Sequence, residues 1–237
     1  MKCMDNNNST VNTIFVTGIG TDVGKTIAAA VLTEALQADY WKPVQAGFDK
    51  GTDSTFIQSV LTNATTKIHP ETYKLKLAAS PHIAAREEGI TIDLNKIEKD
   101  YLGIINTQQS TINNDVSAHS SQPAANNLII EGAGGLMVPL NENEFVLDLI
   151  KKLNATVVLV SRNYLGSINH SLLTTNVCRE HNINVAGWIF NDHYMNYEDE
   201  IVKWSGYKKL ASLPFTSNIS SAFIREQANT FKNNFIF

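Results

Sequence analysis

The sequence predicts an α/β fold, in which a mostly parallel sheet carries helices on both faces. Short continuous apolar runs at 14–16, 128–130 and 157–160 are typical of strands that are buried on both sides of such a sheet. Segments of helical character alternate with these runs, and this alternation favours parallel strands joined by helices. With 237 residues, of which 43% are apolar and 18% charged, the chain can form one large core. We expect a single domain over 13–237.

The composition excludes several classes of partner. Residues 1–12 are polar and rich in asparagine, and we expect them to form a disordered tail rather than an apolar leader. No segment is apolar over the length that crosses a bilayer. The net charge is -4 and no basic cluster is present, which argues against a nucleic-acid partner. Cys3 and Cys178 lack the spacing of a disulfide framework or a metal site. We expect a cytoplasmic protein without a membrane partner.

A glycine-rich stretch, Gly-Ile-Gly-Thr-Asp-Val-Gly-Lys-Thr at 18–26, joins the first apolar run to a helical segment over 27–37. Glycines allow backbone N–H groups to point at an anion, and the helix N-terminus adds partial positive charge. Lys25 can reach the terminal phosphates of a nucleotide, and the hydroxyl of Thr26 can bind Mg²⁺. The stretch therefore predicts a nucleoside triphosphate site and a P-loop NTPase fold. It is one residue longer than the simplest pattern, which would place a glycine at Ile19.

A lysine and an aspartate follow in the next segment. Residues 40–44 are β-prone, and Pro43 indicates that the strand ends there, which places Lys42 at its carboxyl end. We expect a turn at 45–47 and a helix over 55–61, with its start at 52–54. At Asp53 a helix cap and a metal ligand are equally compatible with the pattern.

The middle of the chain contains two expected helices and a loop. Ser80 and Pro81 fit the N-cap and first position of a helix, which leaves His82 a structural role. Apolar residues at helical spacing predict a helix over 94–107. The polar stretch 108–127 contains few apolar residues, and we expect it to form a mobile surface loop.

Further polar residues follow the remaining apolar runs. Glu131 and three glycines come directly after the run at 128–130, where a carboxylate is costly in a core but suits a metal-bound phosphate. A strand at 156–160 precedes residues 166–169 and a helix over 171–181, and a strand at 185–190 precedes Asn191. Ligands bind beyond the carboxyl ends of parallel strands, so we expect these polar residues to share one crevice with the glycine-rich stretch.

Six motifs in this order closely resemble dethiobiotin synthetase. They are the stretch at 18–26, Trp-Lys-Pro-Val at 41–44, Ser-Pro-His at 80–82, Glu-Gly-Ala-Gly-Gly at 131–135, Leu-Gly-Ser-Ile-Asn-His at 165–170 and Ala-Gly-Trp-Ile-Phe-Asn-Asp at 186–192. The similarity extends from about Thr13 to Thr216. It implies a homodimer with a shared active site that joins 7,8-diaminononanoate, CO2 and ATP, with Mg²⁺, to give dethiobiotin, ADP and phosphate in biotin synthesis.

The resemblance also implies roles for individual residues. Mg²⁺ would be held by Thr26, Asp53 and Glu131, and catalysis would involve Lys42, Lys25 and Thr21. The nucleotide would contact Asp22, Val23, Gly24, Lys25, Thr26, Ile27, Asp53, Glu131, Gly132, Ala133, Gly134, Asn191, Asp192 and Pro214. The substrate would contact Lys42, Ala46, Ser80, Gly166, Ser167, Ile168, Asn169 and Tyr197, with 166–169 supplied by the other subunit. One departure is Ala46, where many members of the family have a hydroxyl residue.

Two other classes of P-loop protein remain as alternatives. A dimeric partitioning or site-selection ATPase usually has a second lysine early in the loop, at the position of Gly20 here, and acts on a membrane or nucleic acid. An amidotransferase-type synthetase normally includes a glutaminase domain with a nucleophilic cysteine, for which this chain has no room. Detection of a ureido product would distinguish dethiobiotin synthesis from either alternative.

Overall fold

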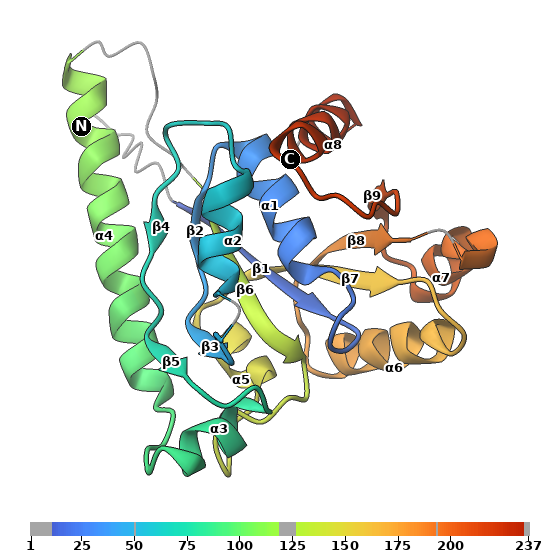
Figure 1. Cartoon of the computed structure of the whole chain (residues 1–237), viewed down its shortest axis with the longest axis horizontal. Helices are drawn as coiled ribbons and strands as arrows, with labels where there is room; N and C mark the ends of the chain where they lie inside the picture. The colour runs from blue at the N-terminus through green and yellow to red at the C-terminus, as the bar shows by residue number, and fades with distance from the viewer. Residues whose placement is uncertain (1–10, 50, 119–126, 193, 235–237) are drawn as a thin grey trace, which may run out of the picture.

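The computed structural model describes residues 11–49, 51–118, 127–192 and 194–234 (Figure 1). The expected tail lies outside these residues except for Val11 and Asn12, and Asn12 already pairs with Asn127 in the sheet. Cys178 is buried, and Cys3 lies outside the described residues. No helix in the described part of the chain is both long enough and apolar enough to cross a membrane.

A parallel sheet forms the centre of the domain. In the described residues it contains seven strands in the order β4-β2-β6-β1-β7-β8-β9, and every neighbouring pair is parallel. Its strands are β1 (Asn12–Gly18), β2 (Asp39–Trp41), β4 (Ile68–His69), β6 (Asn127–Gly135), β7 (Thr156–Arg162), β8 (Val185–Asn191) and β9 (Lys209–Leu213). A separate parallel pair consists of β3 (Val44–Ala46) and β5 (Tyr73–Leu75).

Helices cover both faces of this sheet (Figure 1). They are α1 (Lys25–Leu36), α2 (Asp53–Val60), α3 (Pro81–Glu87), α4 (Leu94–Ala118), α5 (Val146–Lys152), α6 (Ser167–Glu180), the short 3-10 helix η1 (Tyr194–Asn196), α7 (Glu198–Ser205) and α8 (Ser221–Asn234). One core contains residues of α1, α2 and α8, and the other contains residues of α3 to α7. The predicted α/β class, with helices on both faces, is confirmed.

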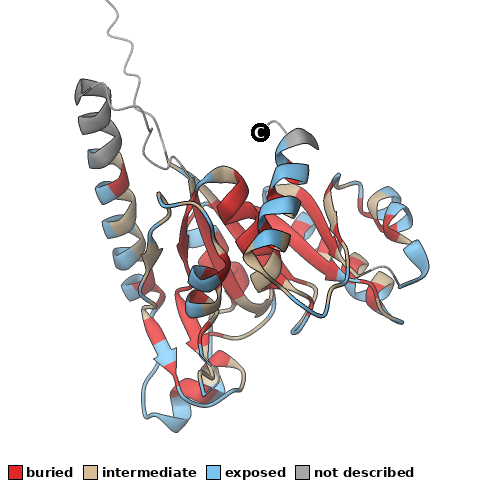
Figure 2. Ribbon diagram, turned by 45° about the horizontal axis from the view of Figure 1, so that its top comes forward, coloured by how far each residue is buried: buried red, intermediate tan, exposed pale blue. Residues whose placement is uncertain are grey.

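Side-chain alternation in β1 explains why the strands are apolar on both sides. Ile14 and Val16 pack in the core that contains α1, whereas Phe15 packs in the opposite core. Figure 2 shows the central strands as almost continuously buried. A run without polar residues is therefore the expected pattern for this position in the sheet.

Two predicted loops are wrong over part of their length. The expected turn at 45–47 is largely the strand β3, because Val44 to Ala46 pair in register with Tyr73 to Leu75. The expected loop at 108–127 begins as helix, since α4 continues to Ala118. Its extension contains neither proline nor glycine, so nothing in it stops helix propagation. Residues 119–126 lie outside the described part of the chain.

Candidate active site

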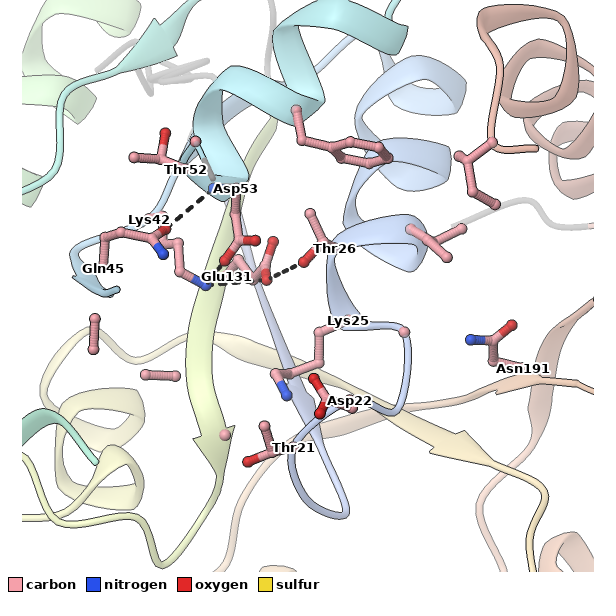
Figure 3. A pocket seen from close by; sticks show the side chains of 18 of the residues that line it. Thr21, Asp22, Lys25, Thr26, Lys42, Gln45, Thr52, Asp53, Glu131 and Asn191 are labelled. Atoms are coloured by element: carbon pink, nitrogen blue, oxygen red, sulfur yellow. Dashed lines mark hydrogen bonds and ion pairs between the residues drawn. The ribbon is translucent and has the colours of Figure 1, made fainter. Parts of the chain in front are cut away.

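The carboxyl ends of the central strands surround a cleft of about 1260 Å³. Figure 3 shows that side chains from α1, α2 and the strand ends converge in it. The predicted residues that line it are Thr21, Asp22, Gly24, Lys25, Thr26, Ile27, Lys42, Ala46, Asp53, Ser80, Glu131, Ala133, Gly134, Asn191, Asp192 and Pro214. The predicted residues outside its lining are Val23, Gly132, Gly166, Ser167, Ile168, Asn169 and Tyr197.

The glycine-rich loop ends at Gly24, which is the N-cap of α1 and has a left-handed φ of 88°. A Cβ atom at this position would lie 1.9 Å from Nδ2 of Asn191, so both the backbone conformation and the space require glycine. Asn191 Nδ2 also donates a 3.4 Å hydrogen bond to the carbonyl oxygen of Val23. The end of β8 is therefore packed directly against the loop.

Lys25 lies at the start of α1 and is only 8% exposed. Its Nζ donates a 2.8 Å hydrogen bond to the carbonyl oxygen of Gly20. Burial lowers the pKa of Lys25, even though the nearby carboxylates of Glu131 and Asp53 favour the charged form. An anion in the cleft would further stabilise the ammonium group, as expected of a phosphate-binding lysine.

Glu131 is 1% exposed and accepts hydrogen bonds on both carboxylate oxygens. Its Oε1 accepts from Thr26 Oγ1 at 2.8 Å and from Lys42 Nζ at 3.1 Å. Its Oε2 accepts from the hydroxyl of Tyr40 at 2.8 Å. A buried carboxylate needs such partners, and here they come from β2, from the residue that follows it and from the helix α1.

Lys42 follows β2 directly, as predicted, and is 4% exposed. Its Nζ lies 2.6 Å from Asp53 Oδ2 as well as 3.1 Å from Glu131 Oε1 (Figure 3). Burial opposes the charged form, but the two carboxylates outweigh it and raise the pKa of Lys42. The lysine is therefore a positive charge held in the cleft at neutral pH.

The structure shows that Asp53 is not the residue that caps α2. The residue that caps this helix is Thr52, whose Oγ1 accepts from the backbone N–H of Thr55 at 3.1 Å, while Thr55 Oγ1 accepts from the N–H of Thr52 at 2.9 Å. The carboxylate of Asp53 instead pairs with Lys42. Gln45 Oε1 accepts a 3.2 Å hydrogen bond from the N–H of Asp53.

Ser80 also lines the cleft, beside the first residue of α3. It occupies the predicted N-cap position, but its side chain makes no capping hydrogen bond. Its Oγ instead lies 3.0 Å from Nδ1 of His82. The hydroxyl of Ser80 therefore contacts His82 and does not cap α3.

Residues 166–169 contain the N-cap and first turn of α6, which begins four residues earlier than the helix expected over 171–181, and they lie outside the lining of the cleft. Ser167 is fully buried, and its Oγ lies 2.7 Å from the hydroxyl of Tyr197. That hydroxyl in turn donates a 2.6 Å hydrogen bond to the carbonyl oxygen of Tyr164. Within one chain, this segment and Lys42 therefore do not share the cleft.

The sequence is similar to those of known proteins. A protein-family model described as an AAA domain matches residues 12–222. The chain is 48% identical over 198 residues to the ATP-dependent dethiobiotin synthetase BioD of Cytophaga hutchinsonii, which covers 83% of this chain and 85% of that protein. It is 36% identical over 219 residues to the protein of the same name from Christiangramia forsetii, with 92% and 95% covered. The chain belongs to the dethiobiotin synthetase family.

Solved structures of other P-loop proteins resemble this member of the dethiobiotin synthetase family in fold. A ParA family ATPase from Chlorobium tepidum superposes with a TM-score of 0.53 at 12% identity, covering 93% of this chain and 99% of the other. The MinC:MinD cell division complex of Aquifex aeolicus gives a TM-score of 0.53 at 13% identity, with 95% and 98% covered. These likenesses confirm the P-loop NTPase fold, and at such low identity they indicate the fold alone.

The side chains in the cleft fit the Mg²⁺ site expected of a dethiobiotin synthetase. Among the described residues, no group of three or more His, Cys, Asp or Glu could hold a metal ion without other ligands. Mg²⁺ commonly binds one or two carboxylates and completes its coordination with phosphate oxygens and water. Thr26, Asp53 and Glu131 supply hard oxygen atoms of this kind, and Lys42 offsets one of the two negative charges of the carboxylates.

Several residues of the cleft were not predicted from the sequence. They include Gln45, Phe56, Arg162 and Phe223, which line the cleft, and Tyr40, which lies behind it and contacts Glu131. Tyr40 could have been found, because it lies two residues before Lys42 and two positions along a strand return to the same face. The others lie on β3, α2, β7 and α8, and their approach to the cleft depends on the tertiary structure.

Proposed function

We propose that the cleft joins 7,8-diaminononanoate and CO2 in a ureido ring, with conversion of ATP to ADP and phosphate, and so produces dethiobiotin for biotin synthesis. The observation that carries this proposal is the position of Lys42. It is a buried cation beside a P-loop, in a chain of the dethiobiotin synthetase family. A partitioning or site-selection ATPase has no second anionic substrate, and so it does not need a buried positive charge beside its nucleotide to bind one.

The chemistry requires two anions to approach each other. One amine of the substrate adds to CO2 and loses a proton, which gives a carbamate. A carbamate oxygen then attacks the γ-phosphorus of ATP, ADP leaves, and a carbamic-phosphoric anhydride forms. The second amine attacks the carbamyl carbon and loses a proton, which closes the five-membered ring and expels phosphate. In this proposal Lys42 and Lys25 hold the carbamate, and Lys25 also stabilises the charge that develops on the transferred phosphoryl group.

Residues around the P-loop would bind the nucleotide. The backbone N–H groups of 22–26 would contact the phosphates, and Asn191, Asp192 and Pro214 would line the adenine pocket. Thr26, Asp53 and Glu131 would hold Mg²⁺, which when bound neutralises phosphate charge. Thr21, near the phosphates, would assist in catalysis. The polar lining and the helix N-terminus at this end of the cleft support these roles.

The substrate would extend from Lys42 toward a second subunit. Ser80 would contact the diamine end, where the methyl group of Ala46 offers no hydrogen bond. The tail carboxylate would meet residues 166–169 and Tyr197 of the partner subunit at the N-terminus of α6, which favours an anion. A nine-carbon chain spans roughly 10 Å, long enough to reach a separate anchor. We therefore propose a homodimer with two shared sites.

A product assay tests the proposed function directly. The purified chain is supplied with 7,8-diaminononanoate, bicarbonate and MgATP, and dethiobiotin is measured by mass spectrometry. We expect one ADP for each dethiobiotin and no dethiobiotin when any component is omitted. Hydrolysis of ATP at the same rate with and without the diamine, and without a ureido product, would refute the proposal.

We expect Glu131→Gln to reduce Mg²⁺-dependent turnover by about tenfold or more, because it replaces a charged oxygen ligand with a neutral amide of the same size. Titration of Mg²⁺ at fixed ATP would measure the change, and thermal unfolding would show whether stability changes less. An unchanged Mg²⁺ dependence would place Glu131 outside the metal site.

A further inference from the structure

Tyr40 does not line the cleft, but it contacts Glu131, which does. The tyrosine is fully buried in the core that contains residues of α1, α2 and α8, and it is in register with Ile129 of the neighbouring strand β6. Residues two positions apart on a strand share a face, so Tyr40 lies on the face of Lys42, and Ile129 on the face of Glu131. The hydroxyl of Tyr40 donates a 2.8 Å hydrogen bond to Glu131 Oε2.

The two oxygens of Glu131 have different neighbours. Oε1 is the one that contacts Thr26 at 2.8 Å and Lys42 at 3.1 Å, and so it faces the phosphate end of the cleft. Among the described residues, the hydroxyl of Tyr40 is the group that donates a hydrogen bond to Oε2. Because the carboxylate is buried, this bond restricts its rotation and directs Oε1 toward the P-loop.

We propose that Tyr40 is a positioning residue for the proposed metal site, which holds Glu131 Oε1 in the orientation that binds Mg²⁺ with the nucleotide. Groups that orient a metal ligand through a hydrogen bond typically change metal affinity by tenfold to a hundredfold when they are removed. This inference rests on the proposed function, in which Glu131 is a Mg²⁺ ligand. It adds a residue that contacts neither metal nor substrate.

The test measures how much Mg²⁺ strengthens ADP binding. Isothermal titration calorimetry gives the Kd of ADP in excess Mg²⁺ and in excess EDTA, and the ratio of the two values reports the metal without any need for turnover. We expect Tyr40→Phe to shrink this ratio by about tenfold, with the Kd in EDTA unchanged. In turnover assays, the Mg²⁺ concentration for half-maximal rate should rise by a similar factor, while kcat recovers when Mg²⁺ is saturating.

Tyr73→Phe is a matched control. Tyr73 is also buried, and its hydroxyl accepts a 2.9 Å hydrogen bond from the backbone N–H of Asp93, away from the lining of the cleft. We expect its removal to lower the melting temperature and to leave the Mg²⁺ ratio unchanged. An unchanged ratio in Tyr40→Phe would overturn the inference, and so would unfolding of Tyr40→Phe at 25 °C while Tyr73→Phe remains folded.

Glu131→Gln separates this inference from the proposed function. A reduced Mg²⁺ ratio in Glu131→Gln together with a reduced ratio in Tyr40→Phe supports the inference. An unchanged ratio in Glu131→Gln would overturn both the metal role of Glu131 and the role of Tyr40. If the chain forms no dethiobiotin but both variants show the reduced ratio, the proposed reaction fails and the positioning role of Tyr40 stands.

Discussion

Replacing Lys42 with methionine is expected to lower the rate of dethiobiotin formation by about a hundredfold or more while ATP still binds. The substitution keeps most of the apolar stem and removes the ammonium group that would hold the carbamate. The ammonium group of Lys42 pairs with Asp53 and Glu131. Its removal leaves Lys25 and the N-terminus of α1 in place to bind the nucleotide phosphates. Single-turnover rates and ATP affinity measured on the same preparation would separate the two effects.

Lys25→Met is the comparison for this experiment. Lys25 opens α1 at the P-loop, and we expect its loss to weaken ATP binding as well as turnover. Lys42→Met should differ in one further way, because it leaves two carboxylates of like charge close together in a largely buried site. Its melting temperature should fall without ligand and recover with Mg²⁺ and ADP. Equal losses of ATP affinity in the two variants would contradict the separate roles.

A heterodimer with one lesion in each chain is expected to regain about half of the wild-type activity. One lesion is Lys42→Met and the other is Asn169→Trp, which would block the anchor for the substrate tail. Asn169 is exposed, whereas the neighbouring Ser167 is fully buried and would not accept a large side chain without disruption. If sites are shared across a two-fold axis, one site of this dimer has both lesions and the other has none.

The matched control places both lesions in one chain and pairs it with a wild-type chain. In a dimer with shared sites, each site then has one lesion, and we expect almost no activity. If each chain had its own complete site, the results would be reversed, with half activity here and almost none for the lesions in separate chains. Differently tagged chains purified as heterodimers allow both arrangements to be measured.

Features that depend on neighbours within a few residues could be predicted from the sequence. The continuous apolar runs predicted parallel strands, and the glycine-rich stretch with Lys25 and Thr26 predicted the phosphate-binding turn. The proline after Lys42 placed that lysine at a strand end, where the structure has it. The family followed from the order of six short motifs, and the relatives confirm it.

Where several short-range effects compete, the sequence was a weaker guide. Composition predicted a loop over 108–127, but helix propagation through a stretch without proline or glycine extends α4 to Ala118. The pattern at 52–54 indicated a helix start without showing which side chain caps it. The structure assigns the cap to Thr52, which leaves Asp53 to pair with Lys42.

Contacts between distant segments were decided by the tertiary structure alone. Tyr40 and Glu131 are 91 positions apart, and their hydrogen bond exists because β2 and β6 are neighbours in the sheet with a particular register. The separation of residues 166–169 from the cleft likewise depends on where α6 packs. Local patterns determine which strands and turns form, but the order and register of parallel strands result from packing both faces of the sheet at once, and that packing places each polar side chain in the cleft.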